Sequence, residues 1–118
     1  LYENDWYRKE RNMYKQWRWM SQNASILFLT DNVTQKYVDI SLWSYNKTRT
    51  LDVFVNNQFV FNDTIPIQTK NISFILPAHY GKNFITFISK DGCDKPSDIE
   101  NSTDMRCLSF AIQKIEMK

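Results

Sequence analysis

The sequence predicts an all-β fold, an antiparallel β-sandwich of jelly-roll type with about seven to eight strands and an aromatic-rich N-terminal arm. Three observations favour this class. Short segments with period-two apolar alternation recur after residue 20, turn signals separate them, and the connections are too short for the crossover helices of a parallel sheet. The 118 residues fit one domain, which we divide into an arm, residues 1–20, and a sandwich, residues 24–118.

The first predicted strands are residues 24–30 and 35–45. The former is a compact apolar run. In the latter, Val38, Ile40 and Leu42 alternate with polar and aromatic residues, the pattern of a strand with one face buried. We therefore expect these three side chains to face the core.

A hairpin is predicted next. Residues 49–55 and 58–61 both alternate, and Asn56-Asn57 separates them. Because Asn is the non-glycine residue that best tolerates positive φ, this pair is suited to a two-residue primed turn. The remaining strands are expected at residues 69–76, 82–89 and 108–116, with a short one at residues 18–20.

Composition and charge exclude several classes. With 15% aromatic residues and only two glycines, the chain is neither disordered nor collagen-like. A formal net charge of +2 is too small for a nucleic-acid-binding footprint. The apolar runs are far shorter than a membrane span. Since the sequence begins with Leu1, we expect it to be a segment of a longer protein.

Glycosylation signals are more frequent than composition predicts. The chain has 11 Asn and 17 Ser and Thr, for which chance gives about 1.6 Asn-X-Ser/Thr sequons. Six occur, at Asn23, Asn32, Asn46, Asn62, Asn71 and Asn101. We expect most of them at strand ends or turns, where glycans can leave the surface. The alternative is that Asn-rich and Thr-rich turns produce the motif without modification.

Cys93 and Cys107 lie on either side of a polar loop between two predicted strands. A disulfide is the favoured reading; two free thiols or a zinc site are the alternatives, and zinc would need further ligands. Together with the sequons, a disulfide predicts a location outside the cytoplasm. The loop carboxylates could bind Ca²⁺, or they could be solvated turn residues. They are Asp91, Asp94, Asp98, Glu100 and Asp104.

No catalytic motif is present. His79 is the only histidine, and neither a nucleophile elbow nor a zinc-protease or phosphate-binding motif occurs. Aromatic rings offer another chemistry, since they stack on sugar rings. Trp43 is the first candidate for a carbohydrate contact, and Trp6 and Tyr7 are the further candidates. The alternative is that the rings cover the sheet beneath the arm.

Residues 6–10 (WYRKE), 18–20 (RWM) and 104–108 (DMRCL) form a pattern that resembles the extracytoplasmic C-terminal β-sandwich module of archaeal and bacterial glycosyltransferase-like multi-spanning membrane proteins. The resemblance implies a non-catalytic accessory domain that interacts with a glycan or a cell-envelope component. It also implies a membrane-spanning region elsewhere in the same polypeptide, at the outer face of the membrane. Neither a cofactor nor a nucleic acid is implied.

The same motif residues include charges that we interpret as a structural clamp between the arm and the last strand. They are Glu10, Arg18, Asp104 and Arg106. We expect Arg18 to pair with Glu10 or Asp104, because a buried Arg needs a carboxylate partner. Two other functions remain open: a small sugar-modifying or hydrolytic enzyme on the same scaffold, and a purely structural spacer.

Overall fold

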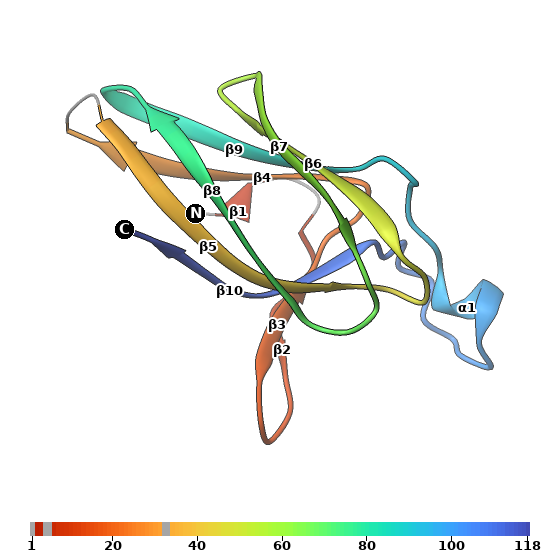
Figure 1. Ribbon diagram of the computed structural model, residues 1–118. Coiled ribbons are helices and arrows are strands. Elements are labelled where there is room, and N and C mark those ends of the chain that lie inside the picture. The colour runs from red at the N-terminus through yellow and green to blue at the C-terminus, as the bar shows by residue number, and fades with distance from the viewer. Residues whose placement is uncertain (1, 4–5, 32–33) are drawn as a thin grey trace.

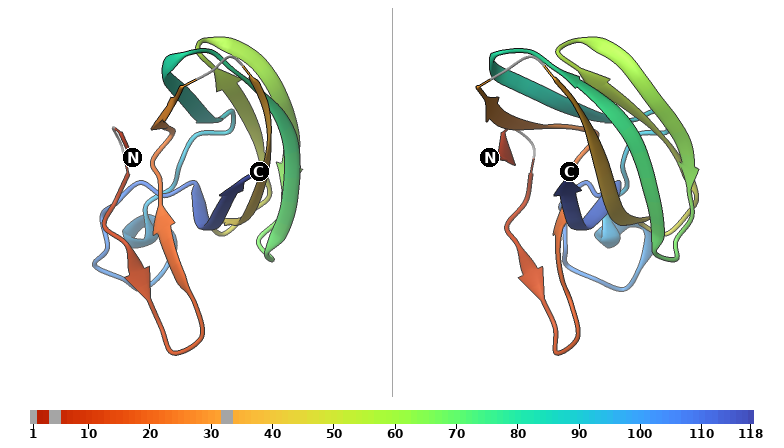
Figure 2. Two further views of the ribbon diagram at one scale, coloured as in Figure 1. Left: turned by 90° about the vertical axis from the view of Figure 1, so that its left-hand side faces the viewer. Right: turned by 60° about the vertical axis from the view of Figure 1, so that its left-hand side comes forward.

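The computed structural model describes residues 2–3, 6–31 and 34–118. Two five-stranded sheets lie face to face, and every strand pairing is antiparallel (Figures 1 and 2). Strands make up 63% of the chain and helix 4%. The predicted fold class is therefore confirmed.

The first sheet has the order β1-β4-β9-β6-β7. Its strands are β1 Tyr2–Glu3, β4 Asn23–Thr30, β6 Arg49–Val55, β7 Gln58–Ile65 and β9 Gly81–Ser89. The turn between β6 and β7 is formed by Asn56 and Asn57, with φ of 49° and 69°. The predicted hairpin turn is confirmed, and its positive φ values explain why two asparagines stand there.

The second sheet has the order β2-β3-β10-β5-β8. Its strands are β2 Glu10–Arg11, β3 Gln16–Trp19, β5 Thr34–Ser44, β8 Lys70–Ala78 and β10 Phe110–Met117. The chain passes between the sheets after β1, β3, β4, β5, β7, β8 and β9, so each layer is built from segments distant in sequence.

The core lies between the inner faces of the two sheets. On β5 it includes Val38, Ile40 and Leu42, all essentially inaccessible, as their parity predicts. Opposite them lie alternate residues of β6 and β9, among them Val53 and Phe87. Period-two alternation thus decides which face of each sheet is buried.

The arm does more than pack on the sandwich, because it contributes strands to both sheets. β1 extends the first sheet through β4, whereas β3 pairs with β10 in the second. Between them Trp6 and Met20 form an isolated bridge. β2 and β3 form a hairpin that projects away from both layers (Figures 1 and 2).

The predicted disulfide between Cys93 and Cys107 is present, with Cα atoms 5.2 Å apart. Its loop contains the short helix α1, Pro96–Ile99, and is closed by a bridge between Asp94 and Leu108. No helix within the described residues has the length and apolar character needed to cross a membrane.

Candidate functional site

The outer face of the second sheet combines aromatic and polar side chains. On β5 the residues that alternate with the core positions are Asp39, Ser41 and Trp43. Because they share one parity, they form a row along the strand on its solvent side. This row connects an aromatic cluster at one end of β5 with a polar hollow at its centre.

The aromatic cluster consists of Trp17, Trp19, Trp43 and Tyr45. Trp43 lies 5.9 Å from Trp17 and 6.1 Å from Trp19, and Trp19 meets Tyr45 edge-on at 5.7 Å, all between ring centroids. Such tilted and edge-to-face contacts are favourable aromatic geometries. The rings of the arm and of β5 therefore stabilise each other.

Ala111 of β10 makes this contact between β3 and β5 possible. It pairs with Trp19 on one side and with Trp43 on the other, and it is fully buried. Because its methyl group is small, the two indoles can meet above it. The ammonium of Lys15 lies 4.2 Å from the Trp43 ring centroid, a cation–π contact that covers part of this ring.

The polar hollow is a shallow depression of about 330 Å³ across β5, β8 and β10. Its lining residues are Asp39, Ile40, Ser41, Asn71, Ile72, Ser73, Lys114 and Glu116. The Ser41 hydroxyl donates to Asn71 Oδ1 at 2.6 Å, and the Ser73 hydroxyl donates to Asp39 Oδ1 at 2.5 Å. The hollow thus presents carboxylates, amide, hydroxyls and an ammonium, the groups that bind sugar hydroxyls.

The two carboxylates of the polar hollow lie opposite each other, Asp39 on β5 and Glu116 on β10. Hydrogen bonds from Lys118 and Ser73 lower the pKa of Asp39. A hydrogen bond from Lys114 lowers the pKa of Glu116. Both groups therefore favour the ionised form at neutral pH.

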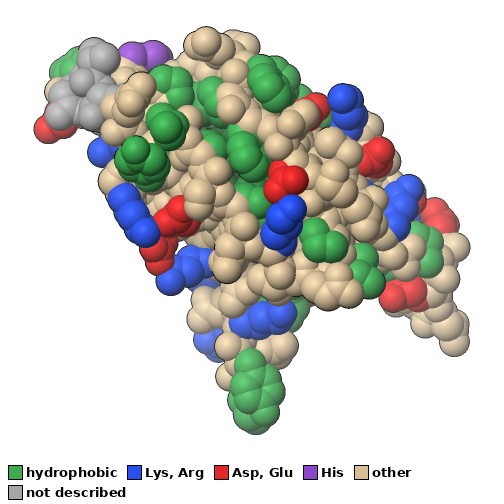
Figure 3. All heavy atoms as spheres, viewed as in Figure 1, with side chains coloured by type: hydrophobic (Ala, Val, Ile, Leu, Met, Phe, Trp, Pro, Cys, Tyr) green, Lys and Arg blue, Asp and Glu red, His purple; other side chains and the backbone are tan. Residues whose placement is uncertain are grey.

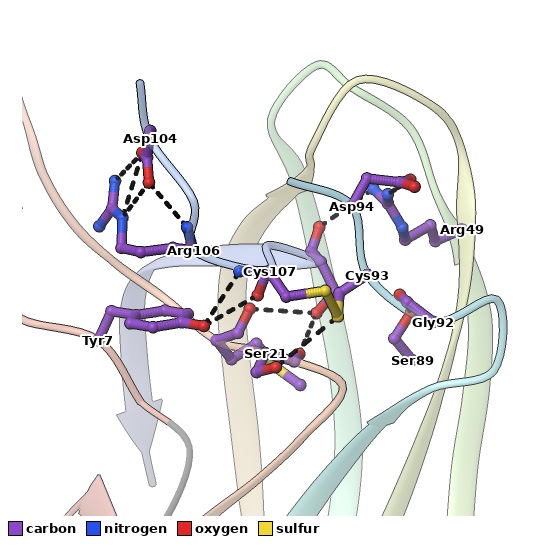
Figure 4. Close-up of a disulfide and its surroundings, with 12 residues drawn as sticks. Tyr7, Ser21, Arg49, Ser89, Gly92, Cys93, Asp94, Asp104, Arg106 and Cys107 are labelled. Atoms are coloured by element: carbon purple, nitrogen blue, oxygen red, sulfur yellow. Dashed lines mark hydrogen bonds and ion pairs between the residues drawn. A yellow bond between two sulfur atoms is a disulfide. The ribbon is translucent and has the colours of Figure 1, made fainter. Parts of the chain in front are cut away.

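Trp6 and Tyr7 do not join this face. Trp6 Nε1 donates to the Ser25 carbonyl oxygen at 2.8 Å, and its ring meets Phe87 edge-on. The Tyr7 hydroxyl accepts from the Cys107 amide at 3.1 Å and donates to its carbonyl oxygen at 3.3 Å (Figure 4). These two rings tie the arm to the core and to the disulfide.

The expected clamp between the arm and the end of the chain is built around Arg106 rather than Arg18. Arg106 pairs with Asp104 at 2.7 Å and with Glu10 at 2.9 Å, and its guanidinium lies over the Tyr7 ring. Our preference for Arg18 as the partner of these two carboxylates was wrong. Arg18 Nη1 donates to the Tyr7 carbonyl oxygen at 3.1 Å. The clamp does join the arm to the end of the disulfide loop.

A buried charge that the sequence did not reveal lies next to the disulfide. Arg49 of β6 has a fully buried side chain and forms an ion pair with Asp94, which is one-third exposed (Figure 4). Burial lowers the pKa of Arg49, and the neighbouring Asp94 opposes that shift. Arg49 also donates to Ser44 Oγ at 3.1 Å, so it links β6 to β5 and to the loop.

The loop carboxylates are used in several separate contacts. Asp94 forms an ion pair with Arg49, and Asp104 forms one with Arg106. Asp91 accepts a hydrogen bond from the Thr50 amide at 2.6 Å. Within the described ranges no group of three or more His, Cys, Asp or Glu side chains converges as a metal site would.

Five of the six sequon asparagines lie within the described residues, and all five are exposed: Asn23, Asn46, Asn62, Asn71 and Asn101. Asn32 lies outside them. Asn62 is in the middle of β7 rather than at a strand end. Asn71 lines the polar hollow, so a glycan there would cover part of this face.

Comparison with known proteins identifies the fold. Neither a family model nor a curated protein matches the chain. A family 35 carbohydrate-binding module from an environmental isolate has a TM-score of 0.58 and 14% identity, over 83% of this chain and 66% of that chain. The likeness is one of fold. The family 35 module from Clostridium thermocellum has a TM-score of 0.59 and 11% identity, over 93% and 85%.

Longer proteins also contain the fold. The Podospora anserina GH26-CBM35 β-(1,4)-mannanase has a TM-score of 0.60 and 13% identity, with 83% of this chain covered. This chain spans only 19% of the mannanase chain and just under two-thirds of the environmental module. The sandwich therefore occurs both as a separate module and as part of a larger enzyme chain.

Proposed function

We propose that this chain is a non-catalytic carbohydrate-binding domain that acts outside the cytoplasm as an accessory part of a larger membrane or surface protein. The single observation that carries the proposal is the polar hollow at the centre of the second sheet, continuous along β5 with Trp43. The fold shared with carbohydrate-binding modules supports it. The disulfide and the exposed sequons support the location.

The hollow suits a glycan because its groups differ in kind and lie on rigid strands. Asp39 and Glu116 accept hydrogen bonds from hydroxyl groups, and Lys114 donates to ring or hydroxyl oxygens. Beside them Trp43 offers an apolar surface to one face of a sugar ring. Lys15 lies over that ring, so binding at Trp43 requires this flexible side chain to move aside.

A hydrolase on the same scaffold is less well supported. A glycosidase needs one carboxylic acid whose pKa is raised, so that it can protonate the leaving oxygen. In the polar hollow the pKa values of both Asp39 and Glu116 are lowered. The hollow is also shallow, whereas catalytic sites are deep pockets that exclude water.

The experiment is a glycan-array screen of the bacterially produced chain, followed by calorimetry with the best ligand. Asp39→Asn and Ser41→Ala should weaken binding roughly ten-fold, since each removes a hydrogen-bonding group from the hollow. Asp52→Asn and Ser25→Ala are the matched controls, because they make the same changes on the first sheet. Absence of any glycan ligand would favour the spacer, and equal losses in the controls would exclude this face.

A further inference from the structure

We propose that the tip of the β2–β3 hairpin is a membrane-surface anchor. Met13 and Tyr14 would enter the interfacial layer of an anionic bilayer, while the basic residues behind them bind lipid headgroups. This surface is separate from the polar hollow, and the inference stands independently of the proposed carbohydrate binding.

The apolar tip is fully displayed to solvent. Met13 and Tyr14 are each 88% exposed, the highest values among the large hydrophobic side chains that the structure describes. Figure 3 shows hydrophobic side chains at the far end of the projection that Figure 1 labels β2 and β3. Two adjacent large apolar side chains exposed at a protruding tip favour an interaction site.

The turn that carries these side chains is held in one conformation. Asn12 Oδ1 accepts hydrogen bonds from the amides of Tyr14 at 2.8 Å and Lys15 at 2.9 Å. The Asn12 amide donates in turn to the Lys15 carbonyl oxygen at 2.9 Å. A preorganised tip loses little conformational freedom on binding.

The base of the hairpin is anchored to the sandwich. β3 pairs with β10, Glu10 pairs with Arg106 at 2.9 Å, and Trp17 packs on Trp43. These contacts at its base hold the hairpin in its projecting position, and its tip remains exposed to solvent.

Positive charge is concentrated on this hairpin. Five of the chain's 15 basic residues lie within residues 8–18, against one of its 13 acidic residues, so the remainder of the chain is net negative. That single acid, Glu10, is already paired with Arg106. Arg8, Lys9 and Arg11 are exposed; Arg11 adjoins the tip, and Arg8 and Lys9 directly precede β2. Clustered basic residues beside an apolar anchor are attracted to anionic lipid headgroups.

A convex apolar tip fits a bilayer better than it fits another macromolecule. A protein or acidic glycan would have to supply a pocket for Met13 and Tyr14, whereas the acyl region of a bilayer accepts any protruding apolar group. Tyr in particular is enriched at the membrane interface, where its ring is apolar and its hydroxyl remains hydrated.

The test is co-sedimentation of the bacterially produced 118-residue chain with vesicles of phosphatidylcholine alone or with about 30% phosphatidylserine. We expect binding to the anionic vesicles only, weakened by salt. The Met13→Ser/Tyr14→Ser and Arg8→Gln/Lys9→Gln variants should each bind roughly ten-fold or more weakly. Leu29→Ser/Tyr80→Ser is the matched control, because these residues are 71% and 72% exposed elsewhere on the molecule and should leave binding unchanged.

Because the two tip side chains lie in solvent, their substitution should not affect folding. The variants should therefore have the same melting temperature as the wild type. A Tyr14→Trp variant gives a second readout: its fluorescence should shift to the blue with anionic vesicles if the ring leaves water. The proposal is overturned by wild-type vesicle binding in the tip variant, by an equal loss in the control, or by no binding to any vesicle. If the chain bound a soluble acidic polymer through this tip but bound no vesicles, the membrane proposal would be wrong and the partner would be an acidic macromolecule.

Discussion

Among single residues, the two arginines that pair with carboxylates of the disulfide loop, Arg49 and Arg106, differ in how deeply their charge is buried. Arg49 is the extreme case, because its guanidinium is wholly buried and its carboxylate partner Asp94 is only partly so. Losing the partner of a buried charge is far more costly than losing an exposed pair. The two members of this pair should therefore respond differently to substitution.

Asp94→Asn should lower the free energy of unfolding by roughly 3 kcal/mol, because it leaves the Arg49 guanidinium buried without its counter-charge. Arg49→Met should cost less, since the remaining Asp94 is hydrated and lies 3.7 Å from Lys47. Urea unfolding measures both. Lys114→Ala, which breaks the exposed pair with Glu116, is the control and should cost under about 1 kcal/mol. Equal small losses for all three variants would show that Arg49 is not buried in solution.

Acid should destabilise the protein through Asp104. Hydrogen bonds from Arg106 hold the pKa of Asp104 below the ordinary value of an aspartate. A carboxyl whose folded pKa is depressed contributes stability above its unfolded pKa and loses it as the pH falls through the folded pKa. We expect Asp104→Asn to flatten the decline in stability between about pH 5 and pH 2. Urea unfolding across that range, with the exposed Asp98→Asn as control, measures it; identical slopes would contradict the pairing.

At the scale of elements, the disulfide orders a long polar connection between β9 and β10. It joins residues 14 apart in sequence, and the enclosed loop carries both Asp94 and Asp104, the partners of Arg49 and Arg106. The cross-link thereby holds Asp94 near Arg49 of β6. Arg106 belongs to the loop itself and joins Asp104 to Glu10 of the arm.

Reduction of the disulfide should lower the free energy of unfolding by roughly 3 kcal/mol in the chain-entropy model. For a domain of this size that corresponds to a fall in melting temperature of roughly 10 °C. Thermal unfolding with and without reductant measures it. The Cys93→Ser/Cys107→Ser variant is the control and should not respond to reductant. Free thiols in protein from its native host would remove the argument for an oxidising compartment.

At the scale of the whole molecule, one of the sequons lies on the same surface as the polar hollow. Asn71 carries a sequon and lines the hollow, whereas Asn62 carries one on the edge strand of the other sheet. A glycan on Asn71 would hinder access to Ser41 and Ser73, its neighbours on the same face. Occupancy at this one site should therefore control ligand binding.

Protein from a glycosylating host should carry glycans on several of the six sequons, as intact mass would show. After passage over the immobilised ligand found by the array, Asn71 should be less occupied in the bound fraction than in the unbound one. Asn62 serves as the internal control and should be equally occupied in both. Glycopeptide mapping measures this, and equal Asn71 occupancy would place ligand binding elsewhere.

The sequence by itself determined the all-β class, the seven strands after residue 20, the Asn56-Asn57 turn and the disulfide, because alternation, turn chemistry and cysteine number are local properties. Only the tertiary structure decided that Arg106, not Arg18, binds Glu10, because these partners are 96 residues apart and meet only through the pairing of β3 with β10 and the course of the disulfide loop. The polar hollow likewise depends on the register of three strands. Tertiary contacts also decide which aromatic residues of the arm pack on Trp43 and which stay exposed at the hairpin tip. No local sequence pattern encodes that difference.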